Sequence, residues 1–595
     1  MVRLRLERTK INSEFHDDYP LRYTSRPFWT CAFFSFIGAF MHLLTENRIG
    51  KAAALCIARW DVVLLCIVAL ILFPILSVFW IAFHPTENIW PHLLSTSLPR
   101  YLSNSITLMV CVAFFALVVG VGTAWAVSRY TFPGHRLFQW ALFLPLAVPS
   151  YIAAYAFVDF WEFAGPVQSA LREHFGWKTS RDYWFFEPRS LTTAVIVIGL
   201  SLYPYVYMLA RSAFQDQSAR AMEVAQALGA SPLKRFWRVA LPLARPSIAV
   251  GAALVMMESL NEFGAVEFFA VQTLTTGIFT TWLEAGNLGG AAQIASVLLL
   301  IVAVLVIWER LSRSRMRVDQ KYNTTLRIQP IALSGSRAWL VSTLCSLPIL
   351  FGFILPVSIM LSHGVSVDDA PQIQAFLAAA INSIWVAGLA GVITVAAALM
   401  VTFSVQLNPS GSRRQLAQFS MLGYAIPGAI LAVGILTPLA FLDRGIADLV
   451  EAWFEVDIGL ILTGSAAGIV LAYTIRFFAL GVGTLSSALN RISPNVLSSA
   501  RALGTAPSKI LGRVHIPMIR GPILIACLLV FVDAVKELPA TLLLRPFGFE
   551  TLSTLIYNSA SREDIEGASL ASIVVILVSM IAVLIVARAS KGADS

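Results

Sequence analysis

The chain has 595 residues, of which 57% are hydrophobic and only 13% are charged, and its formal net charge is +9. Soluble proteins carry about a quarter charged residues, so this composition excludes a soluble globular protein. Apolar runs of about 20 residues recur and predict membrane spans, and basic residues of membrane proteins collect in cytoplasmic loops. The positive charge therefore requires no nucleic-acid partner, and the lipid bilayer is the first partner that the sequence predicts.

Residues 1–55 are expected to form a cytoplasmic or interfacial extension. Residues 1–27 mix charged and polar side chains, as mobile tails do. Phe28–Leu44 is apolar over only about 17 residues, which is the lower limit for a span. A crossing there would place the basic N-terminus outside or invert every later loop, against the positive-inside rule. We therefore expect a segment that does not cross; translation could also begin at Met41.

Residues 56–308 are predicted to form a first transmembrane domain. Its spans are expected near residues 62–83, 104–128, 138–160, 193–210, 247–271 and 294–308. Pro145 and Pro149 interrupt the third span and should kink it. The loops after the second and fourth spans are basic, so both are expected in the cytoplasm.

Residues 309–337 form a basic and therefore cytoplasmic linker, and residues 338–590 are predicted to form a second transmembrane domain. Its spans are expected near residues 338–361, 379–404, 416–440, 459–480, 522–544 and 568–587. Together the two domains predict about 12 spans.

The two domains are repeats of each other. A polar, basic segment, Glu223–Pro242, recurs as Ser498–Pro517 at an offset of roughly 275 positions. The residue pairs that match are Ala225 with Ala500, Gly229 with Gly504, Pro242 with Pro517, Asn104-Ser105 with Asn382-Ser383, and Pro149 with Pro427. An even number of spans per half makes the repeat parallel. We therefore predict an all-α polytopic membrane protein whose two homologous six-helix halves are related by a pseudo-two-fold axis along the membrane normal, with the pathway between them.

Each repeated segment predicts a short helix, a turn and a second helix. The glycines permit the turn that ends the first helix, and the prolines stiffen the entry into the next segment. The two loops, 211–245 and 481–520, lie between spans and are interpreted as docking surfaces. Glu223 could offer its carboxylate to a partner or cap its own helix.

The same residues carry a family resemblance. Glu223, Ala225, Gly229 and Leu241-Pro242 fit the pattern E-A-A, three residues, G, nine residues, I-x-L-P. This pattern resembles the signature loop of permease subunits of bacterial ABC importers that work with a periplasmic binding protein. Val224 departs from it in the first copy. The second copy departs at Ser498, Ser499 and Ile516.

The resemblance implies a mechanism and partners. Each signature loop would supply a coupling helix to one of two copies of a cytoplasmic ATP-binding subunit, and a periplasmic binding protein would deliver the substrate. The chain has no P-loop, so ATP and Mg²⁺ would be bound by the partner subunits. The chain itself would bind no cofactor, catalyse no bond chemistry, and span the bacterial inner membrane many times with both termini in the cytoplasm.

The two docking sites are expected to be unequal. Ser498 cannot supply the charge that Glu223 offers at the same position. We therefore hypothesise that the first loop carries more of the coupling.

Four acidic residues follow the two loops. Glu258 and Glu262 align with Asp533 and Glu537, and each pair shares one helix face at a spacing of four residues. Acidic residues at membrane depth are costly and usually face a cavity or a partner. One interpretation is a wet part of the pathway or the rim where the binding protein docks. The other is an internal ion pair, with Lys536 the nearest candidate, or polar contacts between packed helices.

The substrate is suggested only by resemblance. Asn261–Trp282, Lys536–Ser561 and the fusion of two halves resemble the ferric iron permease subfamily, although thiamine and phosphonate importers share the fused arrangement. In that family the metal is held by the binding protein, and this sequence shows no Cys/His cage for a metal of its own. A secondary transporter or channel would favour inverted repeats, and a membrane enzyme would need a catalytic constellation that the sequence does not show.

Overall fold

The computed structural model describes residues 51–215, 217, 219–319, 330–364, 370–454, 459 and 461–592. The first 50 residues, including Phe28–Leu44 and Met41, lie outside this part of the chain. The described residues are almost entirely helical, because long apolar runs can satisfy their backbone hydrogen bonds within a membrane only as helices. The predicted all-α polytopic fold is confirmed.

The first half contains the following elements in chain order: α2 (Lys51–Phe83), α3 (Trp90–Ser95), α4 (Leu98–Arg129), β1 (Tyr130–Thr131), α5 (His135–Ala141), η1 (Leu144–Ala147), α6 (Ser150–Trp161), α7 (Pro166–Phe175), α8 (Leu191–Gln215), α9 (Ala219–Ala227), α10 (Pro232–Arg235), η2 (Phe236–Ala240), α11 (Leu241–Asn261), α12 (Gly264–Phe268), α13 (Leu274–Phe279), η3 (Thr280–Glu284) and α14 (Leu288–Asp319).

The second half repeats this order: β2 (Ile331–Ala332), α15 (Ser336–Ile349), η5 (Leu350–Ile354), α16 (Leu355–Gly364), α17 (Ala370–Leu407), α18 (Gly411–Ser420), η6 (Met421–Ala425), α19 (Gly428–Phe454), α20 (Ala467–Leu489), α21 (Pro494–Ala502), α22 (Pro507–Ile510), η7 (Leu511–His515), α23 (Ile516–Met518), α24 (Arg520–Val535), α25 (Pro539–Leu544), α26 (Leu552–Ser561) and α27 (Ile565–Gly592).

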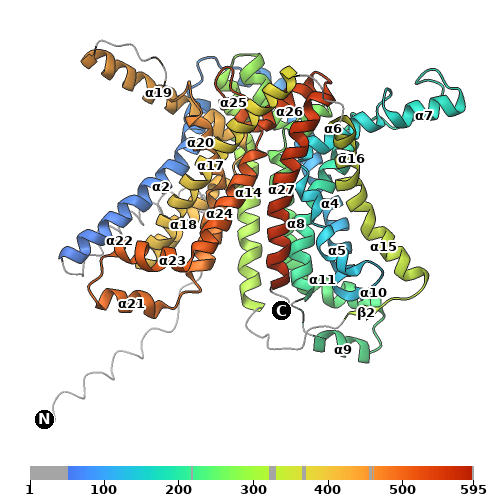
Figure 1. The fold of residues 1–595 in the computed structure, drawn as a ribbon, viewed down its shortest axis with the longest axis horizontal. Helices are drawn as coiled ribbons and strands as arrows, with labels where there is room; N and C mark the ends of the chain where they lie inside the picture. Colours follow the sequence, from blue (N-terminus) through green and yellow to red (C-terminus); the bar gives the residue numbers. More distant parts are fainter. Residues whose placement is uncertain are drawn as a thin grey trace, which may run out of the picture.

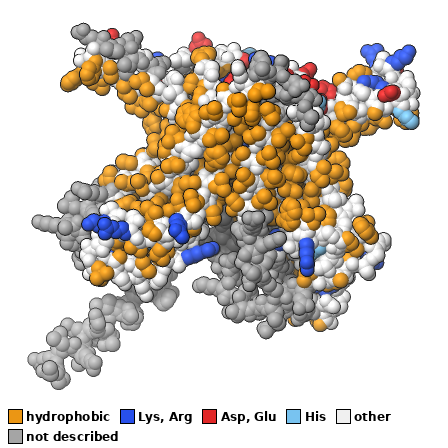
Figure 2. Space-filling view, in the orientation of Figure 1, with side chains coloured by type: hydrophobic (Ala, Val, Ile, Leu, Met, Phe, Trp, Pro, Cys, Tyr) orange, Lys and Arg blue, Asp and Glu red, His pale blue; other side chains and the backbone are white. Residues whose placement is uncertain are grey.

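Ten helical stretches in the described part of the chain are long and apolar enough to cross a membrane, and twelve crossings result if each of two bent pairs counts as one. The short helices α9 and α21 lie at one edge of the molecule, one under each half, whereas α7 and the end of α19 project from the opposite edge (Figure 1). An apolar belt separates these two edges (Figure 2). In this view Asp and Glu lie along the upper edge, and Lys and Arg lie mainly along the lower edge apart from the tip of α7.

Three predicted spans are broken in the structure, and a kink was predicted for the first of them only. The segment 138–160 is divided between α5, η1 and α6, with a bend of 90° between His135–Ala147 and Ser150–Phe175. Pro149 lies at this break, as predicted, because proline removes a backbone donor. The spans expected at 247–271 and 522–544 are wrong at their ends, since α11 stops at Asn261 and α24 at Val535.

The boundary between the halves also differs from the expectation. Helix α14 continues to Asp319, so it includes residues 309–319 of the segment 309–337 that we expected to be a linker. Farther on, Tyr130 and Thr131 of β1 pair in parallel with Ile331 and Ala332 of β2. The chain between the halves is thus attached to the loop that follows α4.

The first membrane span of each half, α2 in one and α15 to α16 in the other, packs against the other half. α2 lies against α17, α18 and α19 of the second half, and α16 lies against α6 of the first half. At Gly434 a Cβ atom would collide with the Pro74 carbonyl, so α19 and α2 are in backbone contact. The buried Arg413 in α18 forms an ion pair of 2.6 Å with Asp61 in α2. These contacts between helices of different halves hold the two halves together.

Candidate functional site

A cavity of about 150 Å³ lies between the two halves. All four acidic residues singled out in the sequence, Glu258, Glu262, Asp533 and Glu537, line this cavity. Its wall contains residues from the ends of α11 and α24, from α8 and α20, and from the starts of α6 and α25. The repeat thus brings the two acidic pairs to one place on the pseudo-two-fold axis.

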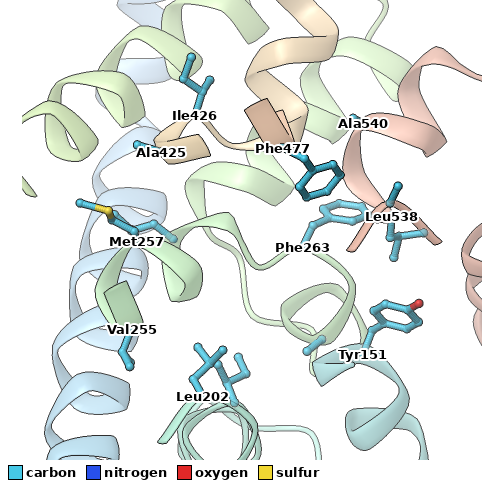
Figure 3. Packing of buried hydrophobic residues seen from close by; sticks show 14 of the residues in the cluster. Tyr151, Leu202, Val255, Met257, Phe263, Ala425, Ile426, Phe477, Leu538 and Ala540 are labelled. Carbon is cyan, nitrogen blue, oxygen red and sulfur yellow. The ribbon is translucent and has the colours of Figure 1, made fainter. Parts of the chain in front are cut away.

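The cavity has an apolar wall made by both halves. Figure 3 shows Phe263, Phe477 and Leu538 close together, although each comes from a different segment of the chain. Tyr151 and Leu202 also line the cavity. Phe263 is 1% exposed and is among the largest fully buried side chains.

Glu262 and Glu537 cap short helices at equivalent positions. Glu262 Oε1 accepts a hydrogen bond from Ala265 N at 3.0 Å, and Glu537 Oε1 accepts one from Ala540 N at 3.1 Å. Each carboxylate thereby satisfies a backbone donor at the start of α12 or α25. This role explains why α11 and α24 end early, because the chain must leave the helix for the carboxylate to reach the next one.

The same pair of hydrogen bonds anchors the capped segment in each half. Asn104 Nδ2 donates to Gln272 O at 2.9 Å, and Asn382 Nδ2 donates to Glu550 O at 2.9 Å. The neighbouring serines accept: Ser105 Oγ from Leu274 N at 2.8 Å, and Ser383 Oγ from Leu552 N at 2.7 Å. The Asn-Ser repeat in the sequence therefore marks the tether between α4 or α17 and the segment that follows the acidic residues.

The next turn is also duplicated. Thr273 with Thr276, and Thr551 with Thr554, form capping boxes at the starts of α13 and α26. Thr275 Oγ1 donates to Glu262 O at 2.8 Å, and Ser553 Oγ donates to Glu537 O at 2.7 Å. Both acidic residues are thus fixed at backbone and side chain, which preorganises the cavity wall.

The halves differ in the partners of these carboxylates. In the first half Ser150 Oγ donates to Glu262 Oε2. The second half has Gly428 in place of Ser150, and a Cβ atom there would collide with Glu537 Oε1. Glu537 instead lies 3.7 Å from Arg476 Nη1. Gly428 leaves space for the Glu537 carboxylate to turn toward Arg476.

Basic side chains enter the cavity from the second half. Lys536 Nζ pairs with Asp533 Oδ1 at 2.7 Å, so the ion pair considered from the sequence is present. The positions aligned with Lys536 and Arg476 in the first half hold Asn261 and Ser201. With all groups ionised, the cavity carries four carboxylates, one guanidinium and one ammonium, and is net acidic.

Several polar atoms of the cavity wall have no hydrogen-bond partner among the described residues. They are both amide atoms of Asn261, Tyr151 Oη and Arg476 Nη1. Asn261 is only 5% exposed. Buried polar groups without protein partners are expected to bind water or a ligand.

A further contact crosses between the halves at the cavity. Tyr424 Oη donates to Glu258 Oε1 at 2.9 Å. Tyr424, Arg476 and Asn261 were missed in the sequence. Arg476 offered a signal, because an arginine within a predicted span is costly unless it has a buried partner. Tyr424 offered only its proximity to Pro427.

The two predicted docking loops have matching backbones. Gly229 and Gly504 both have a left-handed conformation, with φ of +76° and +71°. Behind them, Ala230 N donates to Ala225 O, and Thr505 N donates to Ala500 O. Each short helix therefore ends in a Schellman turn, and the predicted role of the glycines is confirmed. Glu223 lies on α9, but its side chain is outside the described part of the structure.

The second helix of each loop contains a π turn before its proline. These turns, η2 and η7, occupy equivalent positions and immediately precede the helices that contain Pro242 and Pro517. Proline lacks the N–H that would continue the regular helical hydrogen bonds. A π turn accommodates this interruption.

The tips of both loops expose leucine. Leu228 is 82% exposed and Leu503 is 83% exposed. In the first half the exposed apolar surface also includes Val224, Leu233 and Trp237. The aligned residues of the second half are Ser499, Ser508 and Gly512. Among the described residues, no group of three or more His, Cys, Asp or Glu side chains is arranged to hold a metal ion.

Comparison with known proteins agrees with the duplicated architecture. Residues 116–318 and 405–592 each match the family described as "Binding-protein-dependent transport system inner membrane component". The chain is 26% identical over 492 residues to "Fe(3+)-transport system permease protein FbpB 2" of Haemophilus influenzae, covering 82% of this chain and 89% of that protein. It is 22% identical over 553 residues to "Ferric transport system permease protein FbpB" of Actinobacillus pleuropneumoniae, covering 88% of this chain and 76% of that protein.

A single-domain relative matches part of the chain. "Molybdenum transport system permease protein ModB" of Escherichia coli is 30% identical over 211 residues, which are 34% of this chain and 89% of that protein. The family match occurs twice and covers more than half of the chain. The chain therefore belongs to the binding-protein-dependent transport system inner membrane components and contains two copies of the family domain.

Proposed function

We propose that this chain is the fused transmembrane permease of an ABC importer that moves ferric iron across the bacterial inner membrane. A periplasmic binding protein delivers the iron, and two copies of a separate ATP-binding subunit drive the transport with ATP and Mg²⁺. The chain catalyses no bond chemistry, and both of its termini lie in the cytoplasm. The long ferric relatives support ferric iron as the substrate, because this chain matches them over most of their length and across both halves.

The central acidic cavity is the observation that carries the proposal. Four carboxylates against two basic groups favour a cation over an oxyanion at the point where the halves meet. Asn261 and Tyr151 add polar atoms that the described protein groups leave without partners. Such groups can replace part of the hydration shell of a passing ion. They do not surround the ion completely, so it can leave again.

The loops 211–245 and 481–520 are proposed as the coupling loops, with Glu223, Ala225, Gly229, Pro242, Ala500, Gly504 and Pro517 as their characteristic residues. Exposed leucines on a charged, cytoplasmic surface indicate a docking site for a protein partner. The first loop exposes Val224, Leu233 and Trp237, where the second has small or polar residues. This difference supports the hypothesis that the first loop carries more of the coupling.

Uptake of radioactive ferric iron tests the proposal in cells that lack the gene, with and without the gene restored. We expect restored uptake, and its loss when the restored copy carries Gly229→Asp. Unchanged iron uptake would contradict the iron assignment, and parallel uptake of molybdate, thiamine and a phosphonate would then identify the solute.

The pathway role of the cavity has its own test. Glu262→Gln and Glu537→Gln keep an acceptor for the capping hydrogen bond but remove a negative charge. We expect both variants to lower iron uptake when uptake is compared at matched membrane levels of the protein. Uptake at the original rate in both would remove the pathway role and leave the acidic residues as helix caps.

A further inference from the structure

A second cavity, of about 570 Å³, lies at the cytoplasmic end of the first half. It is enclosed by the end of α4, the first coupling loop, the segment around β2 and the start of α15. Three arginines line it, Arg129, Arg235 and Arg337, and no carboxylate is among the described residues that line it. The remaining wall is mostly apolar and includes Trp125 and Leu340. This volume is typical of ligand sites, which measure about 300–1,000 Å³.

The arginines have few protein partners. Among the described residues, none of the three forms an ion pair with a carboxylate. Arg235 Nη1 donates to Gln226 Oε1 at 2.6 Å, but its Nε is buried without a hydrogen-bond partner. Arg129 and Arg235 are half-buried and Arg337 is exposed, so three neighbouring guanidinium groups offer charge-assisted hydrogen bonds to an anion at this place.

The equivalent region of the second half is closed and apolar. Trp125, Arg129, Met222 and Arg235 align with Phe403, Leu407, Leu497 and Ile510, respectively. These four second-half residues form a small buried cluster of their own. Trp60 of α2 packs against the cluster, with its ring 5.2 Å from that of Phe403. Among the described residues, the basic cavity of the first half therefore corresponds to an apolar cluster in the second half.

The cavity continues onto a surface that faces lipid. Helix α15 begins the crossing at Ser336, and its side chains Trp339, Leu340 and Leu344 are 66%, 61% and 56% exposed. Tryptophan at such a position is typical of the membrane interface. The N-terminus of α15 has no side-chain cap, and its free backbone donors add to the positive potential at the cavity.

From this combination we propose that the cavity binds an anionic phospholipid of the cytoplasmic leaflet. The phosphate group lies between Arg129, Arg235 and Arg337, and the acyl chains run along the exposed face of α15. Basic pockets between helices on the cytoplasmic side are suited to such head groups. The bound head group would fill the space between the first coupling loop and the β2 segment, and so would brace this loop only.

The test uses the purified full-length chain in a native mass spectrometry titration. Phosphatidylglycerol and phosphatidylcholine with identical acyl chains are compared for the dissociation constant of the first bound lipid. We expect phosphatidylglycerol to bind about 100-fold more tightly, since each of the three arginines strengthens binding of an anionic lipid by about fivefold.

The decisive variant copies the second half, Arg129→Leu with Arg235→Ile. We expect it to weaken phosphatidylglycerol binding by about 25-fold and to leave phosphatidylcholine unchanged. Arg491→Leu with Arg513→Leu is the matched control, because it removes two exposed charges near the other coupling loop. If the double variant does not fold, Arg337→Gln on the exposed rim should still weaken binding about fivefold.

Three results would overturn the proposal. The first is equal affinity for the two lipids in the original chain. The second is an equal loss of affinity in the cavity variant and the control. The third is displacement of phosphatidylglycerol by millimolar inorganic phosphate, which would assign the arginines to a soluble anion without acyl chains.

Discussion

Tyr424 of the second half donates a hydrogen bond to Glu258 of the first half, with 2.9 Å between Tyr424 Oη and Glu258 Oε1. Both residues line the central cavity, so this bond joins the halves beside the proposed pathway. Any movement that separates the halves at this level must break it. The bond therefore links the stability of the assembled halves to the state of the cavity.

A double-mutant cycle measures the strength of this link. Tyr424→Phe, Glu258→Gln and the combined variant are unfolded from detergent micelles, and their free energies of unfolding are compared. We expect a coupling energy of about 1 kcal/mol, in the range found for hydrogen bonds between membrane helices. Strictly additive effects would show that the two side chains do not stabilise each other.

The two capping carboxylates should differ in their effect on stability. Glu537→Gln leaves Arg476 without its nearby carboxylate, whereas Glu262→Gln leaves no basic residue of its own half uncompensated. Glu258, Glu262 and Asp533 still share the cavity with Arg476, so the loss is smaller than for an isolated buried pair, and we expect Glu537→Gln to cost about 1 kcal/mol more than Glu262→Gln. Thermal unfolding of the purified variants measures the difference.

A second substitution provides the control for this prediction. Arg476→Ser introduces the residue that the first half has at Ser201. Combined with Glu537→Gln, it should recover most of the lost stability because it removes the unpaired charge. Failure to recover would mean that the loss arises from the weakened cap of α25.

The sequence predicted the arrangement of the halves well, for a physical reason. The parallel repeat leaves matching residues at a constant offset, and Asn104-Ser105 and Asn382-Ser383 make the same hydrogen bonds in the structure. A repeated residue pair is visible without any knowledge of its contacts. Hydropathy likewise located the membrane segments, because each must be apolar over about 20 residues.

The ends of the broken helices and the contacts between the halves could not be predicted from the sequence. The run 247–271 stays largely apolar, so hydropathy predicts a span there even though α11 ends at Asn261. The end depends on Glu262 reaching the backbone of the next helix, which is a three-dimensional condition. The approach of Tyr424 to Glu258 depends on how the halves meet, and periodicity within one half carries no information about it.

The serine tethers should be of equal importance in the two halves. Ser105→Ala and Ser383→Ala each leave a buried backbone N–H, of Leu274 or Leu552, without its acceptor. We expect each substitution to lower the free energy of unfolding by about 1–2 kcal/mol. Ser346→Ala is the control, because the hydroxyl of this half-buried serine donates to Thr343 O within its own helix and accepts no bond from another segment in the described structure. A loss in only one half would contradict the equivalence of the tethers.

Substitutions at Gly229 and Gly504 distinguish the cost of backbone strain from a loss of coupling to the ATP-binding subunit. A Cβ atom at either glycine would meet no neighbour within 4 Å, so Gly→Ala acts only through the left-handed backbone and should cost about 1–2 kcal/mol in each half. Gly229→Asn should cost less, since asparagine tolerates this conformation. Gly512→Ala, at an open helical position without positive φ, is the control, and it should not destabilise the chain because alanine is favoured over glycine inside a helix. Thermal unfolding of the purified variants measures these costs.

Gly→Asp adds a charge to the same turns and tests the inequality of the loops. Both aspartates would lie beside an exposed leucine, Leu228 or Leu503, but only the first loop adds the apolar surface of Val224, Leu233 and Trp237. A buried charge without a partner weakens an interface, so uptake should fall further with Gly229→Asp. Both variants are measured at matched membrane levels, and each is compared with its alanine counterpart. Equal reductions would show that the two loops share the coupling equally, despite the difference in their exposed side chains.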